Sequence, residues 1–356
     1  MTRRRQFLSA LTGATVAGLA GCGYRPGGGD IRWSEDLSIA AAGIGSGITT
    51  ADVVGDRLIA VVDSSRTFDF DSSEFRERGL VYAFETDSGT RRWRDELPEP
   101  VRVRALGDPP AVGTEHAVYG YGEGGERWEF EIGSAPLGIA AGGERVYVRT
   151  DAGKLRSIRR GRQQWTLDVP ASQRHDAAVA ADHRGVVYRD GDRLRRVDRD
   201  GSRQWNRPVP SETGDVRIVD DLLFVSTHRE TVAVEVASGR ERWRSDARLE
   251  AVDVTDRGVC VVSDERVTAV DHAGERRWRV GGESGGIEAG MGGFTGIVAD
   301  ETAVYVTSAD SIFELDPTDG SVRWTVSHDT VSAGPFRVDS GVLVLVDDRL
   351  VCHHPD

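Results

Sequence analysis

Acidic side chains alternate over one short segment of this 356-residue sequence. Asp69, Asp71 and Glu74 place carboxylates at a spacing that could surround a hard cation, and calcium prefers oxygen ligands of this kind. The segment lacks the internal glycine turn of calcium-binding loops. A solvated acidic surface is the alternative and the favoured interpretation, so we expect no metal site here.

Glycines crowd a second segment, residues 281–296. Phosphate-binding loops are glycine-rich, but they also need a strand, a helix and a lysine or hydroxyl residue at fixed spacing. Those features are missing, so we expect a flexible rim loop. His353 and His354 are adjacent, and neighbours on a strand point to opposite faces, which argues against a shared metal. No catalytic residue is predicted from these patterns.

Processing chemistry is indicated at the amino terminus. The core of a twin-arginine export motif is matched by Arg4, Arg5, Phe7 and Leu8. The apolar run that follows, about 14 residues, is too short to span a bilayer as a helix. It ends in Leu-Ala-Gly-Cys, which resembles a lipobox, with Cys22 as the lipid attachment site. An ordinary secretory peptide is the alternative. We expect a signal peptide over 1–22, a flexible tether over 23–30, and anchorage to the outer face of the cell membrane.

All eight tryptophans share one local pattern, with a glycine four residues earlier. The tryptophans are Trp33, Trp93, Trp128, Trp165, Trp205, Trp243, Trp278 and Trp324. The glycines are Gly29, Gly89, Gly124, Gly161, Gly201, Gly239, Gly274 and Gly320. From Trp93 onward the pattern recurs about every 38 residues, a period typical of propeller blades.

Each repeat reads as four short strands. In residues 215–243, runs rich in β-branched residues are separated by Asp, Gly and Ser, and no helical period competes. The carboxyl terminus supplies inner strands without a tryptophan strand, and residues 31–35 supply a tryptophan strand with nothing before it. Joining them closes a ring and removes exposed sheet edges. The sequence therefore predicts an all-β, eight-bladed propeller over 31–356, with four-stranded antiparallel blades.

Residues 81–93, Val-Tyr-Ala-Phe-Glu-Thr-Asp-Ser-Gly-Thr-Arg-Arg-Trp, resemble the repeat of pyrroloquinoline-quinone (PQQ) type propellers. That family includes quinoprotein alcohol dehydrogenases and the propeller lipoprotein of the bacterial outer-membrane assembly machine. The resemblance to the dehydrogenases would imply PQQ, a calcium ion held by Glu, Asn and Asp, and usually a disulfide of adjacent cysteines. This chain has no adjacent cysteines, and its one asparagine, Asn206, falls on a predicted outer strand. We therefore expect no cofactor, with a PQQ enzyme or a degenerate PQQ-binding relative as the alternative.

The net charge of −13 disfavours nucleic-acid binding, because a phosphate backbone requires a basic surface. One lysine among 45 basic residues, combined with this acidity, resembles the proteins of halophilic archaea. A GC-rich genome is the alternative explanation. Cys260 and Cys352 fall in apolar strands two blades apart, so they are predicted to be free thiols.

Residues 64–78 form the longest insertion, inside the first complete blade. Phe68, Phe70 and Phe75 make it apolar enough to dock a partner, although it could equally fold back on its own blade. The favoured function is a monomeric, non-catalytic scaffold or ligand-binding module. Its partner would be an extracytoplasmic protein or a small ligand, held near the membrane by the lipid anchor.

Overall fold

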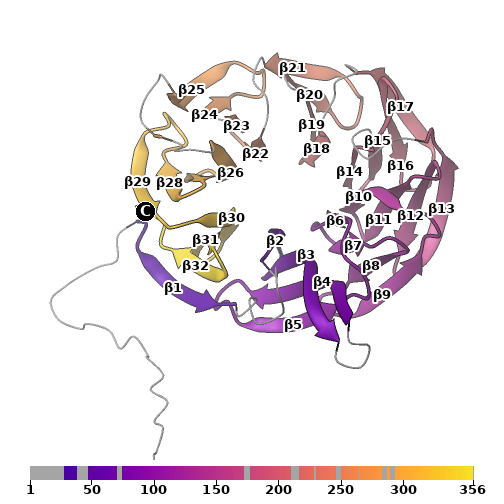
Figure 1. Ribbon diagram of the computed structural model, residues 1–356. Coiled ribbons are helices and arrows are strands. Elements are labelled where there is room, and N and C mark those ends of the chain that lie inside the picture. The colour runs from indigo at the N-terminus through magenta and orange to yellow at the C-terminus, as the bar shows by residue number, and fades with distance from the viewer. Residues whose placement is uncertain are drawn as a thin grey trace, which may run out of the picture.

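The computed structural model describes residues 28–37, 47–69, 74–171, 177–209, 216–227, 230–245, 250–263, 265–282, 287–288 and 293–355. These residues form 32 strands in eight four-stranded antiparallel sheets arranged as a ring around a central channel (Figure 1). The predicted eight-bladed propeller is confirmed. The export motif, Cys22, Asp71 and Phe70 lie outside the described residues.

The strands follow one another from the channel outward within each blade. Blade 1 contains β2 (Thr50–Val54), β3 (Arg57–Asp69), β4 (Glu74–Glu85) and β5 (Arg91–Glu96), and blade 2 contains β6 (Val103–Ala105), β7 (Ala111–Gly113), β8 (Ala117–Tyr121) and β9 (Arg127–Glu131). Blade 3 contains β10 (Pro136–Gly142), β11 (Arg145–Thr150), β12 (Lys154–Arg159) and β13 (Arg162–Asp168), and blade 4 contains β14 (Val179–Asp182), β15 (Gly185–Asp190), β16 (Arg193–Asp198) and β17 (Arg203–Pro208). Blade 5 contains β18 (Val216–Val219), β19 (Leu222–Ser226), β20 (Thr231–Glu235) and β21 (Glu241–Ser245), and blade 6 contains β22 (Ala251–Thr255), β23 (Gly258–Ser263), β24 (Arg266–Val270) and β25 (Arg276–Gly281). Blade 7 contains β26 (Phe294–Ala299), β27 (Val304–Ser308), β28 (Ser311–Leu315) and β29 (Val322–Ser327), and blade 8 contains β30 (Val331–Val338), β31 (Gly341–Val346), β32 (Arg349–His353) and β1 (Ile31–Asp36).

The alternation of strand direction gives the ring two different faces. The inner strands begin on one face, and the connection between the second and third strands of each blade returns to that face. We call it the hairpin face, because the long β3–β4 hairpin lies there. The opposite face carries the turns between first and second strands and between third and outer strands. The start of β1 also lies on the opposite face.

Both ends of the chain build blade 8. β1 pairs with β32 from Ile31↔His353 to Asp36↔Arg349, and the ladder is extended by hydrogen bonds from Gly29 N to His354 O and from Leu37 N to Asp348 O, both 2.9 Å. The ring is thereby closed by backbone pairing between residues more than 300 positions apart, as the sequence predicts.

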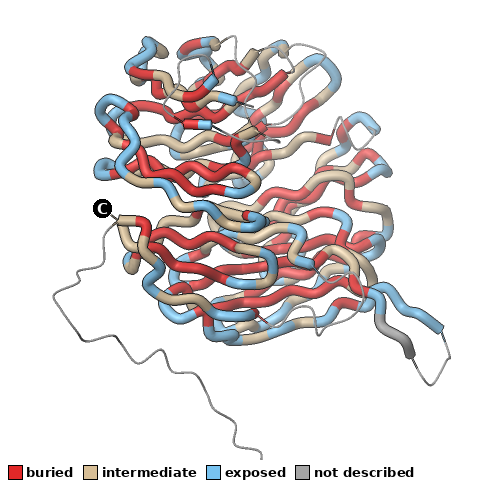
Figure 2. Tube along the Cα trace, turned by 60° about the vertical axis from the view of Figure 1, so that its left-hand side comes forward, coloured by how far each residue is buried: buried red, intermediate tan, exposed pale blue. Residues whose placement is uncertain are grey.

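The core consists of eight apolar clusters, one at each seam between neighbouring blades. At the closing seam, Leu343 and Leu350 of blade 8 pack with Leu58, Tyr82 and Phe84 of blade 1. Figure 2 shows buried segments running through the ring, whereas outer strands such as β5 and β29 alternate between exposed and partly buried positions. Each blade therefore buries its two faces against its neighbours in the ring.

Each tryptophan side chain except one covers its seam by placing its indole ring against the turn glycine of the next blade. A Cβ built on Gly320 would lie 2.7 Å from a ring atom of Trp278, and one on Gly239 would lie 2.8 Å from Trp205. The remaining ring contacts join Trp324 to Gly29, Trp33 to Gly89, Trp93 to Gly125, Trp165 to Gly201 and Trp243 to Gly274. These glycines have φ between 71° and 88°, a region in which a side chain is strained.

Blade 2 departs from the predicted spacing. Gly125, three residues before Trp128, takes the left-handed conformation and contacts Trp93, whereas Gly124 contacts Glu126 instead. In the other seven blades a β-bulge inserts one unpaired residue just before the tryptophan, and the β8–β9 ladder has none. The missing bulge residue explains the shift of the glycine by one position.

Cys260 and Cys352 are both buried and free. Cys260 lies on β23 in blade 6 and Cys352 on β32 in blade 8. The predicted absence of a disulfide between them is confirmed.

Candidate binding face around the channel mouth

A long hairpin projects from blade 1 on the hairpin face (Figure 2). β3 and β4 pair as far as Asp69↔Glu74, well beyond the last pair between β2 and β3, Thr50↔Val61. The predicted insertion thus continues the two strands as a ribbon, with Phe68 opposite Phe75 in the ladder. Phe75 is 60% exposed, so the tip of this ribbon presents an aromatic ring to solvent.

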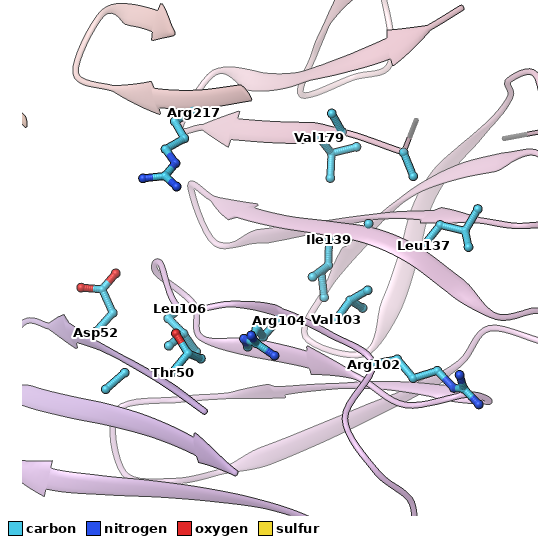
Figure 3. A pocket seen from close by; sticks show the side chains of 14 residues that line it. Thr50, Asp52, Arg102, Val103, Arg104, Leu106, Leu137, Ile139, Val179 and Arg217 are labelled. Carbon is cyan, nitrogen blue, oxygen red and sulfur yellow. The ribbon is translucent and has the colours of Figure 1, made fainter. Parts of the chain in front are cut away.

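The mouth of the central channel opens on the same face. Its cavity of about 710 Å³ is lined by the starts of the inner strands of blades 1 to 5 (Figure 3). The lining includes Thr50, Asp52, Arg102, Arg104, Leu106 and Arg217. Polar and charged groups from blades 1, 2 and 5 therefore converge on one opening, whereas blades 3 and 4 contribute small and apolar residues. Ligand sites commonly combine an apolar lining with a few convergent polar groups.

Charges of both signs face the cavity. Asp52 and Arg217 project into the open space from different blades (Figure 3). Arg104 is held in place by Asp63 of blade 1, to which it donates a hydrogen bond of 2.7 Å. Burial by the surrounding protein raises the pKa of the Asp52 carboxyl, although this side chain reaches the channel. A 2.8 Å hydrogen bond from Val53 N to the carboxylate offsets part of that increase in pKa. This arrangement favours recognition of a polar or charged surface.

Asp253 occupies the equivalent third position of inner strand β22. Burial raises its pKa, while hydrogen bonds from Val254 N (2.8 Å) and Ala299 N (2.7 Å) lower it in part. Because Ala299 belongs to β26, this carboxylate joins the inner strands of blades 6 and 7. Asp253 therefore has a structural role in linking these two blades.

The residues considered for metal and cofactor chemistry do not come together at the channel. Asn206 lies on outer strand β17, where it accepts a 2.5 Å hydrogen bond from Arg193. Within the described residues, no group of three or more His, Cys, Asp or Glu side chains could hold a metal ion. His353 is fully buried and its ring bonds Gly29 O (2.7 Å) and His328 (3.1 Å), so it belongs to the closing seam.

Spacing alone could not have identified the channel residues. Asp52, Arg104 and Arg217 are far apart in the sequence and become neighbours only through the ring. They share a position near the start of an inner strand whose other residues are mostly small or apolar. Among the residues that the structure describes, there is no helix with the length and apolar character needed to cross a membrane.

Eight blades closed by the two chain ends, with a tryptophan on each outer strand, define the class: a PQQ-type repeat propeller. The sequence matches the family described as "Outer membrane protein assembly factor BamB" over residues 77–244 and 208–352. The chain belongs to that family.

Solved structures share the fold at low sequence identity. BamB from Moraxella catarrhalis has a TM-score of 0.64 and 17% identity, covering 91% of this chain and 99% of that one. The computationally designed Ika8 protein has a TM-score of 0.59 and 14% identity, with coverage of 87% and 97%. KlHsv2 with loop 6CD replaced by a Gly-Ser linker has a TM-score of 0.54 and 8% identity, with coverage of 79% and 98%. No curated protein sequence matches the chain.

Proposed function

We propose that this protein is a non-catalytic scaffold that binds an extracytoplasmic protein through its hairpin face. The observation that carries the proposal is the projection of the β3–β4 hairpin, with Phe75 60% exposed, from the face where the channel mouth opens. Membership of a family described as an assembly factor supports a role in protein interaction.

The rigid ring suits this role. The closed seams fix the hairpin relative to the channel mouth, so a partner meets a preformed surface and less ordering entropy is lost on binding. Phe75 offers an aromatic anchor of the kind that dominates interface energetics. Asp52 and Arg217 offer charges that set orientation and specificity.

Attachment to the outer face of the cell membrane forms part of the proposal and rests on the leader sequence. β1 begins on the face opposite the hairpin, so a tether that precedes it leaves the hairpin face available to partners. Replacing Cys22 with serine should move the exported protein from the membrane fraction to the soluble fraction. Retention of the Cys22→Ser protein on membranes that are washed with high salt would contradict lipid anchorage.

Chemical crosslinking in membranes tests the interaction itself. A tagged wild-type protein should give a discrete crosslinked adduct, identifiable by mass spectrometry. A variant in which residues 64–78 are replaced by a two-residue turn should lose it, because the insertion adds to the hairpin and leaves the Leu58–Phe84 part of the ladder intact. An adduct of equal yield from the shortened variant would refute binding through the hairpin.

A further inference from the structure

A second cavity, distinct from the channel mouth, opens on the opposite face at the seam between blades 2 and 3. Its volume is about 620 Å³, within the range of small-ligand sites. It is bounded by the turns of three blades, and its lining includes Asp108, Glu123, Glu126, Trp128, Glu144 and Arg160. We call it the seam cavity.

The seam cavity exists where the tryptophan does not cover the seam. Gly161 is the turn glycine that Trp128 should meet, but its contacts are the Trp128 Cβ and the backbone of Glu129, with no ring atom of the indole. The other seven tryptophans all place ring atoms against their glycines. The Trp128 ring therefore leaves the turn of blade 3 uncovered, although the side chain still packs against the apolar cluster between blades 2 and 3.

Two local features of blade 2 hold the ring in this orientation. The β8–β9 ladder lacks the bulge that precedes the tryptophan in every other blade, and bulges re-aim side chains. Trp128 also pairs with Gly120, and a Cβ on Gly120 would lie only 2.0 Å from its ring. Three other blades have alanine at this position, Ala83, Ala233 and Ala269. Only a glycine lets the indole lie flat on the strand.

The residues that line the seam cavity include four carboxylates and three arginines, an excess of one negative charge. Arg57 donates to two backbone oxygens, Gly122 O (3.0 Å) and Glu123 O (2.8 Å). Arg127 pairs with Asp95 (3.2 Å), and Arg160 pairs with Glu144 (3.5 Å). Within the described part of the chain, Asp108, Glu123 and Glu126 have no arginine or lysine partner.

We propose that the seam cavity binds a small organic cation of the alkylammonium class, with Trp128 as its aromatic wall and Asp108, Glu123 and Glu126 as its counter-charges. An indole face attracts a cation through its quadrupole, and the attraction increases when the cation loses water in a cavity. The alkyl groups of such a cation also bury apolar surface against the ring.

Calorimetric titration with choline, at constant ionic strength, tests the proposal. The neutral isostere 3,3-dimethyl-1-butanol is the matched ligand control, because it keeps the shape and removes the charge. Choline should bind saturably and the neutral isostere should not. Trp128→Ala should weaken choline binding by about tenfold, the effect of losing one cation–π contact in a partly desolvated site.

Gly120→Ala is the decisive variant, since it restores the residue found in three other blades and forces the indole towards Gly161. It should abolish choline binding while the unfolding midpoint stays at or above that of the wild type. Ala233→Gly, the reverse change in blade 5, should leave choline binding unchanged. Equal binding of choline and its neutral isostere, absence of saturable binding, or full choline affinity in a folded Gly120→Ala variant would each overturn the proposal.

Discussion

The contact between Trp278 and Gly320 should show strong energetic coupling, because each residue is shaped to the other. Trp278 is 7% exposed, and its indole N–H donates a 3.1 Å hydrogen bond to Pro317 O. Trp278→Ala should reduce the free energy of unfolding by about 3–5 kcal/mol, the usual cost of removing a large buried aromatic side chain.

Gly320→Ala should be destabilising for two separate reasons. Gly320 has φ +76°, and the left-handed conformation costs an alanine about 1–2 kcal/mol. The new Cβ would also lie 2.7 Å from the Trp278 ring, an overpacking that costs about 1–3 kcal/mol. In the double variant the ring is absent, so the conformational cost and a 3.1 Å contact with Val280 remain. The double variant should therefore be about 1–3 kcal/mol more stable than the sum of the single effects predicts.

Gly55→Ala provides the matched control, because Gly55 has φ +62° and nothing within 4 Å of a built Cβ. It should cost only the conformational term and should be additive with Trp278→Ala. Urea unfolding followed by circular dichroism at fixed salt measures all five variants. Additive energies for Trp278→Ala and Gly320→Ala, within about 0.5 kcal/mol, would refute the account of how the seams are covered.

Three further predictions concern the closing seam, the thiols and the hairpin. Burial holds the pKa of His353 below its ordinary value of 6.5. The contribution of His353 to stability should therefore be present above pH 6.5 and be lost as the pH falls below that value. Urea unfolding should show a lower free energy of unfolding at pH 5.0 than at pH 7.5, and this decrease should be smaller in His353→Gln. Burial raises the pKa of Cys260 to about 12, so iodoacetamide at pH 8 should modify Cys260 and Cys352 only after unfolding. Peptide mapping that finds label on Cys260 or Cys352 in the native protein would contradict their placement. Phe75→Ser should change the free energy of unfolding by less than about 0.5 kcal/mol, because the ring is largely exposed. A larger decrease, measured by urea unfolding, would mean that Phe75 packs on the blade.

The fold can be predicted from the sequence because the sequence is periodic. A tryptophan and a glycine at fixed spacing reveal a repeating turn and outer strand, and the unmatched ends imply the composite blade. Gly124 is the exception, because Gly125 and not Gly124 contacts the neighbouring tryptophan. This shift follows from the missing bulge in the β8–β9 ladder, a feature of backbone pairing that residue identities do not reveal.

The candidate binding sites are harder to predict from the sequence than the fold. The sequence places Phe75 within an insertion, but the continuation of β3 and β4 as a ribbon depends on cross-strand pairing. Asp52 and Arg217 meet only after ring closure, and the seam cavity depends on the orientation of one indole ring. These are properties of three-dimensional packing, for which spacing along the chain gives no signal.

Site-specific photocrosslinking in intact cells reports whether a protein partner binds the hairpin face. One variant carries a benzophenone amino acid in place of Phe75, and a second variant carries it in place of Arg160 on the opposite face, where the side chain is 77% exposed. A discrete protein adduct is expected from position 75 and none from position 160. An adduct from position 160 alone, or none from either position, would contradict binding at the hairpin face.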